Sequence, residues 1–190
     1  MNSLTDNALM LKVKAGDLDK MGLLFERYHR PLFGYLYHVT GKAHVSEDLV
    51  QNVFYRMLKY RHTFTDEGEF RSWMYHLARN VVADHVQKNK QMASYDDVAN
   101  WAEKVGGGIA ADEHLEKEQE MLMLQAALGK LSLENRELLV MSRFQELKYI
   151  EIAQLLKTTE GAVKVRIHRA LKELKEIFFQ LEKELKAHEL

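Results

Sequence analysis

Basic side chains gather in one short stretch near the C-terminal end of the chain. Residues 157–175 hold six Lys or Arg against two Glu, whereas the whole chain has a formal net charge of −1. Apolar residues recur here at helical spacing, so the basic ones fall on the outer face of a helix that begins near Glu160. Such a face binds phosphate groups and reads base edges, which is the chemistry of duplex recognition. The residues concerned are Thr159, Glu160, Lys164, Arg166, His168 and Arg169.

A short helix is predicted just before this stretch, and together the two helices are typical of a helix-turn-helix. Residues 149–156 place Ile152, Ala153 and Leu156 on one side, and three or four residues then form a turn. Small Ala153 lets two helices cross closely, as a helix-turn-helix requires. Lys157 stands in the turn where most such motifs have glycine. A solvated amphipathic helix with a basic face is the alternative, and the preceding helix and turn favour DNA binding.

Residue types used in catalysis and metal binding are present without the spacing that such sites need. The nine histidines form no H-E-x-x-H motif, and the chain has no cysteine. The glycines 106–108 are not followed by the Lys-Ser/Thr pair of a phosphate-binding loop, and no G-x-S-x-G motif occurs. The sequence therefore predicts a protein that is not an enzyme and holds no metal or cofactor.

The elements that position these residues are predicted to be all helical. One proline and ten glycines leave few helix breakers, and β-branched runs are short. Apolar residues recur at helical spacing over residues 18–40, 46–58 and 69–89. We expect Ser46 to cap the second of these helices, and Pro31 to bend the first without breaking it.

Composition divides the chain into two small helical domains. Residues 91–118 lose the helical periodicity, contain three consecutive glycines and hold two basic against seven acidic residues. We expect an N-terminal helical bundle at 1–90, a flexible acidic linker at 91–118 and a helix-turn-helix domain at 119–190.

The sequence contains no candidate membrane segment. It has no run of eighteen apolar residues, and its first twenty residues mix Asn, Asp and Lys with Leu and Val, unlike a secretory signal. The lack of cysteine suits a reducing compartment. We expect a cytoplasmic protein with no membrane insertion.

Three segments resemble the extracytoplasmic-function (ECF) group of the sigma-70 family. YIEIAQLL and TTEGAVKVRIHRALKEL are similar to the group's C-terminal promoter-reading domain, with Val165 where serine is common. EDLVQNVFYRMLKY, residues 47–60, resembles the helix with which sigma factors grip the polymerase clamp, with Asn52 replacing the usual acid. FRSWMYHLARNVVADHVQK, residues 70–88, resembles the helix that handles the melted promoter.

The resemblance implies a sigma factor that gives RNA polymerase its promoter specificity in transcription initiation. The expected partners are core polymerase, through its β′ clamp and β subunit, promoter DNA, and an anti-sigma factor. Polymerase is expected to contact Asp48, Gln51, Asn52 and Tyr55. The single-stranded −10 element is expected to contact Phe64, Arg71, Trp73, Tyr75, His76, Arg79 and Asn80. The duplex −35 element is expected to contact the six residues at 159–169 given above.

Several alternatives stay open at this point. Trp73 is either a core residue or a stacking platform for an extruded base, and Phe64 has the same two readings. The acidic linker either mimics nucleic acid inside polymerase or serves as a solubilising tether. If the two domains pack together, both DNA-binding faces are expected to be buried. A self-sufficient helix-turn-helix regulator is the rival for the whole chain, and it predicts tight DNA binding without polymerase. A scaffold bundle that binds neither is a minor alternative.

Overall fold

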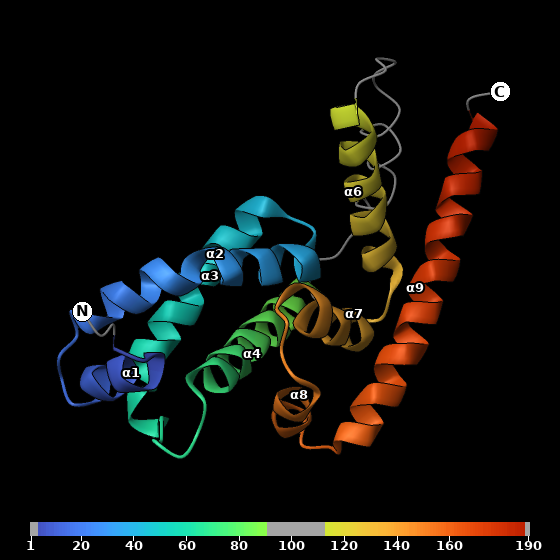
Figure 1. Cartoon of the computed structure of the whole chain (residues 1–190). Helices are drawn as coiled ribbons and strands as arrows, with labels where there is room; N and C mark the ends of the chain where they lie inside the picture. The colour runs from blue at the N-terminus through green and yellow to red at the C-terminus, as the bar shows by residue number, and fades with distance from the viewer. Residues whose placement is uncertain (1–3, 91–112, 189–190) are drawn as a thin grey trace.

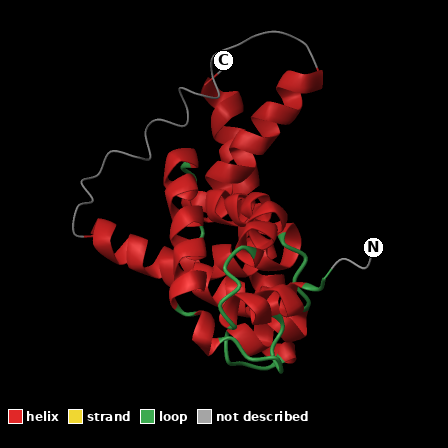
Figure 2. Cartoon of the chain, turned by 90° about the vertical axis from the view of Figure 1, so that its left-hand side faces the viewer, coloured by secondary structure: helices red, strands yellow, loops and turns green. Residues whose placement is uncertain are grey.

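The computed structural model of the chain describes residues 4–90 and 113–188, and these residues contain helices and no strand (Figures 1 and 2). The N-terminal unit comprises α1 (Asp6–Lys14), α2 (Lys20–Thr40), α3 (Ala43–Lys59), the 3-10 turn η1 (Arg61–Thr63) and α4 (Phe70–Lys90). The C-terminal unit comprises α6 (Glu113–Lys130), α7 (Leu133–Leu139), the π-helical turn η2 (Val140–Phe144), α8 (Tyr149–Leu155) and α9 (Glu160–His188). The all-helical prediction is confirmed.

The N-terminal unit is a bundle in which α2 packs against α1 and α3, and α3 against α4 (Figure 1). The buried stripe of α2 includes Leu24, Leu32 and Leu36, which recur at the helical spacing seen in the sequence. Gly41 ends α2 in the left-handed conformation (φ 73°), and its N–H donates to the carbonyl of Tyr37. This glycine cap reverses the chain so that α3 returns along α2.

Two details of this unit bear on the sequence predictions. α2 runs unbroken through Pro31, as predicted. The prediction that Ser46 caps α3 is wrong, because α3 begins three residues earlier, at Ala43. Ser46 is buried in the first turn, where its hydroxyl donates to the carbonyl of Lys42 at 2.8 Å and lies 3.0 Å from the Thr40 hydroxyl.

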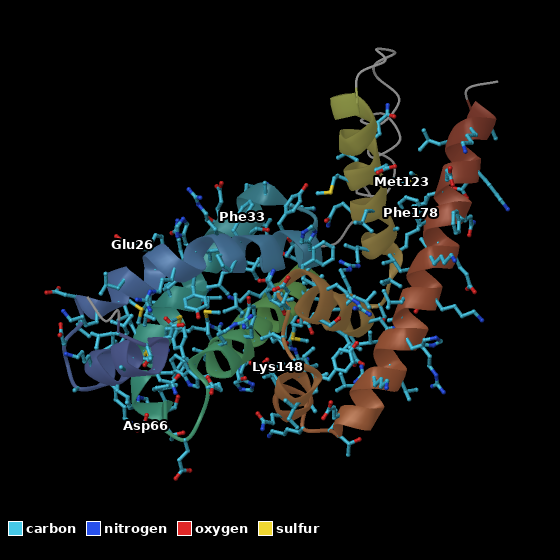
Figure 3. All side chains as sticks on the ribbon, in the orientation of Figure 1. Glu26, Phe33, Asp66, Met123, Lys148 and Phe178 are labelled. Atoms are coloured by element: carbon cyan, nitrogen blue, oxygen red, sulfur yellow. The ribbon has the colours of Figure 1, made fainter. Side chains whose placement is uncertain are left out.

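The C-terminal unit is organised around the long helix α9, which packs against α6, α7 and α8. Its buried stripe includes Val163, Ile167, Ala170 and Leu181. Phe178 lies on the side of α9 that faces α6 (Figure 3). α9 is therefore one continuous helix that begins beside α8 at Glu160 and ends at His188.

The two units pack directly against each other. α4 contacts α8, and α2 contacts η2, α6 and α7. A single cluster of buried apolar side chains contains residues of both units, and Lys148 marks the place beside α4 where α8 begins (Figure 3). α6 begins at Glu113, so residues 113–118, expected to be linker, are helical. The rest of the expected linker, 91–112, lies outside the described residues.

Candidate nucleic-acid interface

The helix-turn-helix is formed by α8, a four-residue turn (156–159) and α9. Lys157 adopts the left-handed conformation (φ 51°) in the position where such turns favour glycine. The Thr159 hydroxyl accepts a hydrogen bond from the N–H of Ala162 at 3.2 Å, which caps the first turn of α9. Buried Ile152, Ala153 and Val163 join the two helices.

The outer face of α9 is exposed to solvent in its first three turns. Besides Gly161, the exposed residues are Thr159, Glu160, Lys164, Val165, His168 and Arg169. Arg166 lies at the edge of this face, half-buried, and its Nη2 lies 3.3 Å from Oε2 of Glu134 on α7. Five of the six predicted duplex-binding residues are thus available together, and the sixth is held by an acid of its own domain.

An apolar residue lies within this basic face. The Val165 side chain is 51% exposed, although it is β-branched and apolar. At 100° per residue it lies between Lys164 and Arg169 around the helix. Its methyl groups therefore form part of the surface that would enter a groove.

The predicted polymerase-binding residues share the exposed face of α3. Asp48, Gln51, Asn52 and Tyr55 are all exposed, Tyr55 by 63%. Their spacing of three and four residues places them on one side of a helix. The opposite side is fixed by the bundle core, which buries Leu49, Val53 and Phe54 among other residues. The side-chain oxygen Oδ1 of Asn52 accepts a hydrogen bond from Nε of Arg56 at 3.1 Å.

The predicted −10 residues of α4 fall on two different sides of that helix. Arg71, Tyr75 and Arg79 recur every four residues and face the C-terminal domain; we call them the inner stripe. Trp73, His76 and Asn80 form the outer stripe, whose centre lies roughly 130° from that of the inner stripe around the helix. His76 and Asn80 are exposed, and the half-buried Trp73 ring donates from Nε1 to the Thr63 hydroxyl at 3.2 Å. The outer stripe alone is available to an external ligand in this arrangement.

Each member of the inner stripe is hydrogen-bonded to the C-terminal domain. Arg71 Nη2 donates to the main-chain oxygen of Gln145 at 2.6 Å, and the Tyr75 hydroxyl donates to Oε1 of the same residue at 2.6 Å. Arg79 Nε donates to Oε2 of Glu137 at 3.2 Å. Burial raises the pKa of the Tyr75 phenol, so it stays a hydrogen-bond donor.

Glu137 is a buried acid at the centre of the domain contact. Its side chain is 6% exposed, and its second oxygen accepts a hydrogen bond from the Tyr35 hydroxyl of α2 at 3.2 Å. Burial raises the pKa of its carboxyl group, and the nearby Arg79 guanidinium partly offsets this. Both carboxylate oxygens therefore have partners, and both partners belong to the other domain.

Phe64 does not offer its ring to a base in this structure. It is 1% exposed and packs edge-on against Trp73 and Phe70, with ring centroids 5.4 and 6.3 Å apart. The loop that carries it folds back onto the bundle, and Lys14 Nζ donates to its carbonyl. In this structure Phe64 is therefore a core residue and not a stacking platform for a base.

The packed arrangement covers one of the two predicted DNA-binding faces and leaves the other open. The inner stripe is covered, whereas the outer face of α9 is exposed. The expectation that packing buries both faces is therefore wrong, because the C-terminal domain uses α6, α7, η2 and α8 for the contact and leaves the outer face of α9 exposed. Glu137 and Gln145 were not predicted. Glu137 carries a signal in the sequence, since it is an acid on the apolar side of its helix.

Features of two other classes of protein are not found in the described residues. None of the described helices is both long and apolar enough to span a membrane. In residues 4–90 and 113–188, no three His, Asp or Glu side chains are grouped as metal ligands would be.

Comparison with known families identifies the two domains in the same order. Residues 24–92 match the family model of sigma-70 region 2, and residues 121–174 match that of sigma-70 region 4. The chain belongs to the sigma-70 family of RNA polymerase sigma factors.

Curated relatives place it within the ECF group of that family. The chain is 26% identical over 171 residues to the ECF RNA polymerase sigma factor SigW of Bacillus subtilis, covering 86% of this chain and 91% of SigW. It is 28% identical over 183 residues to the ECF sigma factor BldN of Streptomyces coelicolor, covering 90% and 66%. The chain is thus an ECF sigma factor, which directs promoter-specific transcription initiation by RNA polymerase.

Two solved structures share the fold. CnrH, in complex with the cytosolic domain of CnrY, aligns with a TM-score of 0.69 at 20% identity and covers 92% of this chain and 97% of its own. The sigma factor RpoE of Bartonella quintana, in complex with the anti-sigma factor NepR, aligns with a TM-score of 0.63 at 18% identity, covering 82% and 94%.

Proposed function

We propose that the three functions of this sigma factor are divided among three helices, α3 for polymerase, α4 for the −10 element and α9 for the −35 element. The observation that carries the proposal is the separation of exposed faces. α3 presents a polar face with an acid and two amides, and α9 presents a basic face, on different domains. In this division, domain 1–90 corresponds to region 2 and domain 119–190 to region 4.

The polymerase-binding part of the proposal assigns Asp48, Gln51, Asn52 and Tyr55 to the clamp contact. These side chains are exposed while their helix is anchored by a buried core, so substitutions there change the surface and leave the fold intact. Asn52 is an amide that is already bonded to Arg56, so it contributes no charge to the contact.

The −10 part of the proposal uses both stripes of α4. Arginine supplies charge for phosphate groups, and aromatic rings supply faces on which bases stack. Stacking contributes about 1–3 kcal/mol per base, comparable to the few kcal/mol that unstacking costs. Capture of an extruded base therefore drives melting without a catalytic step, and we propose no enzymatic activity for the chain. Phe64 supports this region from its core and is not assigned a direct contact.

The −35 part of the proposal assigns the outer face of α9 to the major groove. Lys164, His168 and Arg169 point outward, and the helix N-terminus is capped by Thr159. Helix-turn-helix proteins contact base edges with this part of the second helix. Loss of Lys164 and Arg169 should weaken holoenzyme binding to promoter duplex, whereas Lys183→Ala at the far end of the same helix should not.

Family membership suggests two further properties. We propose that an anti-sigma protein regulates this factor. The structurally similar sigma factor RpoE was solved in complex with the anti-sigma factor NepR. We also propose that it acts in the cytoplasm, where polymerase and promoter DNA meet.

The deciding experiment is co-elution with core RNA polymerase by size exclusion. Wild type should co-elute, and the Asp48→Arg/Gln51→Ala variant should not, because an acid and an amide of the proposed contact are replaced. Glu120→Arg, a matched charge reversal at an exposed site on α6, should bind like wild type. If wild type fails to bind core polymerase and binds promoter DNA tightly alone, the self-sufficient regulator replaces this proposal.

A further inference from the structure

The C-terminal domain supplies acceptors to the side chains that would otherwise bind the −10 strand. Glu137 accepts from Arg79, and Gln145 accepts from both Arg71 and Tyr75. Protein–DNA hydrogen bonds are made largely by such donors to phosphate and base acceptors. We propose that Glu137 and Gln145 are an intramolecular substitute for DNA, which keeps the inner stripe of α4 unavailable until the domains separate.

Glu137 has partners only across the domain contact. Its hydrogen bonds go to Tyr35 and Arg79, both in the N-terminal domain. A buried carboxylate is costly unless it is paired and hydrogen-bonded. Both conditions are met in the closed arrangement alone, so this residue contributes to domain association rather than to the folding of its own domain.

Gln145 occupies its position because of the backbone around it. The π-helical turn places its N–H on the carbonyl of Val140 at 3.0 Å, and Glu146 after it adopts the left-handed conformation (φ 53°). This combination directs both its carbonyl and its side chain at α4. π-helical turns are rare and are frequently found at functional positions. Here the turn aligns two acceptors with two neighbouring donors, Arg71 and Tyr75.

We call the hydrogen bonds from the inner stripe to Glu137 and Gln145 the lock. The lock covers only one of the three proposed functional surfaces. The polar face of α3 and the basic face of α9 remain exposed in the closed form. The closed protein can therefore bind polymerase and contact duplex DNA, while the inner stripe is withheld from single strands. This inference rests on the proposed −10 role of α4.

The domain arrangement of the free protein can be measured directly because the chain has no native cysteine. Spin labels at Glu26→Cys on α2 and Lys183→Cys on α9, both exposed positions, report the distance between the domains. Wild type should give one narrow distance distribution by pulsed electron paramagnetic resonance. Glu137→Arg sets two cations face to face and should give a broad, longer distribution.

Two further variants separate a broken lock from a misfolded protein. The double variant Glu137→Arg/Arg79→Glu restores opposite charges in swapped positions and should return the narrow distribution. Glu134→Arg makes the same charge reversal one turn earlier on α7, at a residue whose partner Arg166 lies in its own domain, and should stay narrow. A narrow distribution for Glu137→Arg, with unchanged helicity, would overturn the lock.

Masking of the DNA site is tested with a labelled, AT-rich single-stranded oligonucleotide and the free full-length chain. Glu137→Arg should raise its affinity about tenfold or more over wild type, because apparent affinity scales with the fraction of competent molecules. Glu134→Arg, with the same change in charge, should bind like wild type. Separated domains without a gain in affinity would show that the inner stripe is only structural. Both readouts use the free protein, so they stand apart from the polymerase co-elution that decides the proposed function.

Discussion

Arg79 and Glu137 lie 58 residues apart in the chain and are joined by a hydrogen bond of 3.2 Å between Nε and Oε2. The arginine belongs to the helix proposed to bind the −10 strand, and the glutamate belongs to the domain proposed to bind the −35 duplex. The contact therefore makes the state of one DNA site depend on the position of the other domain.

The closed arrangement should be favoured by lower pH. Burial raises the pKa of the Glu137 carboxyl above its ordinary value of 4.5, and the facing groups Arg79 and Tyr35 lower it only in part, while Glu134 raises it. In the open form the carboxyl meets water, so the closed form binds the proton more tightly. Lowering the pH through the window above 4.5 therefore stabilises the closed form, and raising the pH removes that contribution.

This pH dependence can be followed with the spin-label pair in a series of buffers that starts near neutral pH and descends toward the ordinary carboxyl pKa of 4.5. The share of the narrow distribution should rise as the pH falls in wild type. In Glu137→Gln, which has no proton to bind, that share should be independent of pH. An opposite slope in wild type would contradict the assignment of the effect to burial of this carboxyl.

Removing the backbone strain at Lys157, in the turn of the helix-turn-helix, should stabilise the C-terminal domain. Lys157 has φ of 51°, a conformation that costs a residue with a side chain about 1 kcal/mol and costs glycine little. Lys157→Gly should therefore raise the unfolding temperature, measured by circular dichroism. Lys157→Ala keeps the backbone cost and should give no gain, so a gain in both variants would trace the effect to the lysine side chain instead.

Val165 should contact a thymine methyl group in the −35 duplex. Its methyl groups are exposed in the middle of the basic face of α9, and apolar contact with the C5 methyl is how proteins recognise thymine in the major groove. Replacing each thymine of a selected −35 duplex by deoxyuridine should, at one position, weaken holoenzyme binding about fourfold, the value of one buried methyl. The Val165→Ser holoenzyme should lack this penalty while keeping the effects of the other positions.

Arg136 should be irreplaceable by lysine. Its Nη1 donates to the carbonyl of Val39 in the N-terminal domain, and its Nη2 donates to the carbonyls of Gly129 and Leu131 at the end of α6. An ammonium group is a single point and cannot span these positions as a planar guanidinium does. Arg136→Lys should cost about 1–3 kcal/mol in urea unfolding, since at least one partly buried carbonyl loses its partner. Arg143→Lys, at an exposed position, is the control and should be neutral.

The parts of the fold that depend on neighbouring residues could be predicted from the sequence. The stripe of Val163, Ile167 and Ala170 and the small residue Ala153 indicated the helix-turn-helix, and both are buried as expected. The Ser46 prediction failed because a serine followed by acids is also compatible with the first turn of a helix that starts earlier. In the structure its hydroxyl is satisfied within the bundle, by the Lys42 carbonyl and the Thr40 hydroxyl.

The domain contact could not be predicted because its partners are far apart in the chain. Tyr35 and Glu137 are separated by 102 residues, and Tyr75 and Gln145 by 70. Helical periodicity shows that Arg71, Tyr75 and Arg79 share a side of α4, and it does not show what faces them. Only Glu137 carries a signal in the sequence, because it is an acid among apolar residues. Such an acid predicts a buried partner, but the sequence does not identify that partner.

The continuity of α9 has a mechanical consequence. Lys164 lies in the part of α9 proposed to contact DNA, and Leu181 is buried near the other end of the same helix. The two residues are 17 positions apart, or about 26 Å along the helix axis. A straight helix transmits rotation along its length, so the angle at which the recognition end meets a groove is set partly by how the distal end is seated. A partner that tilts this distal end would thereby tune promoter strength from a site that touches no DNA.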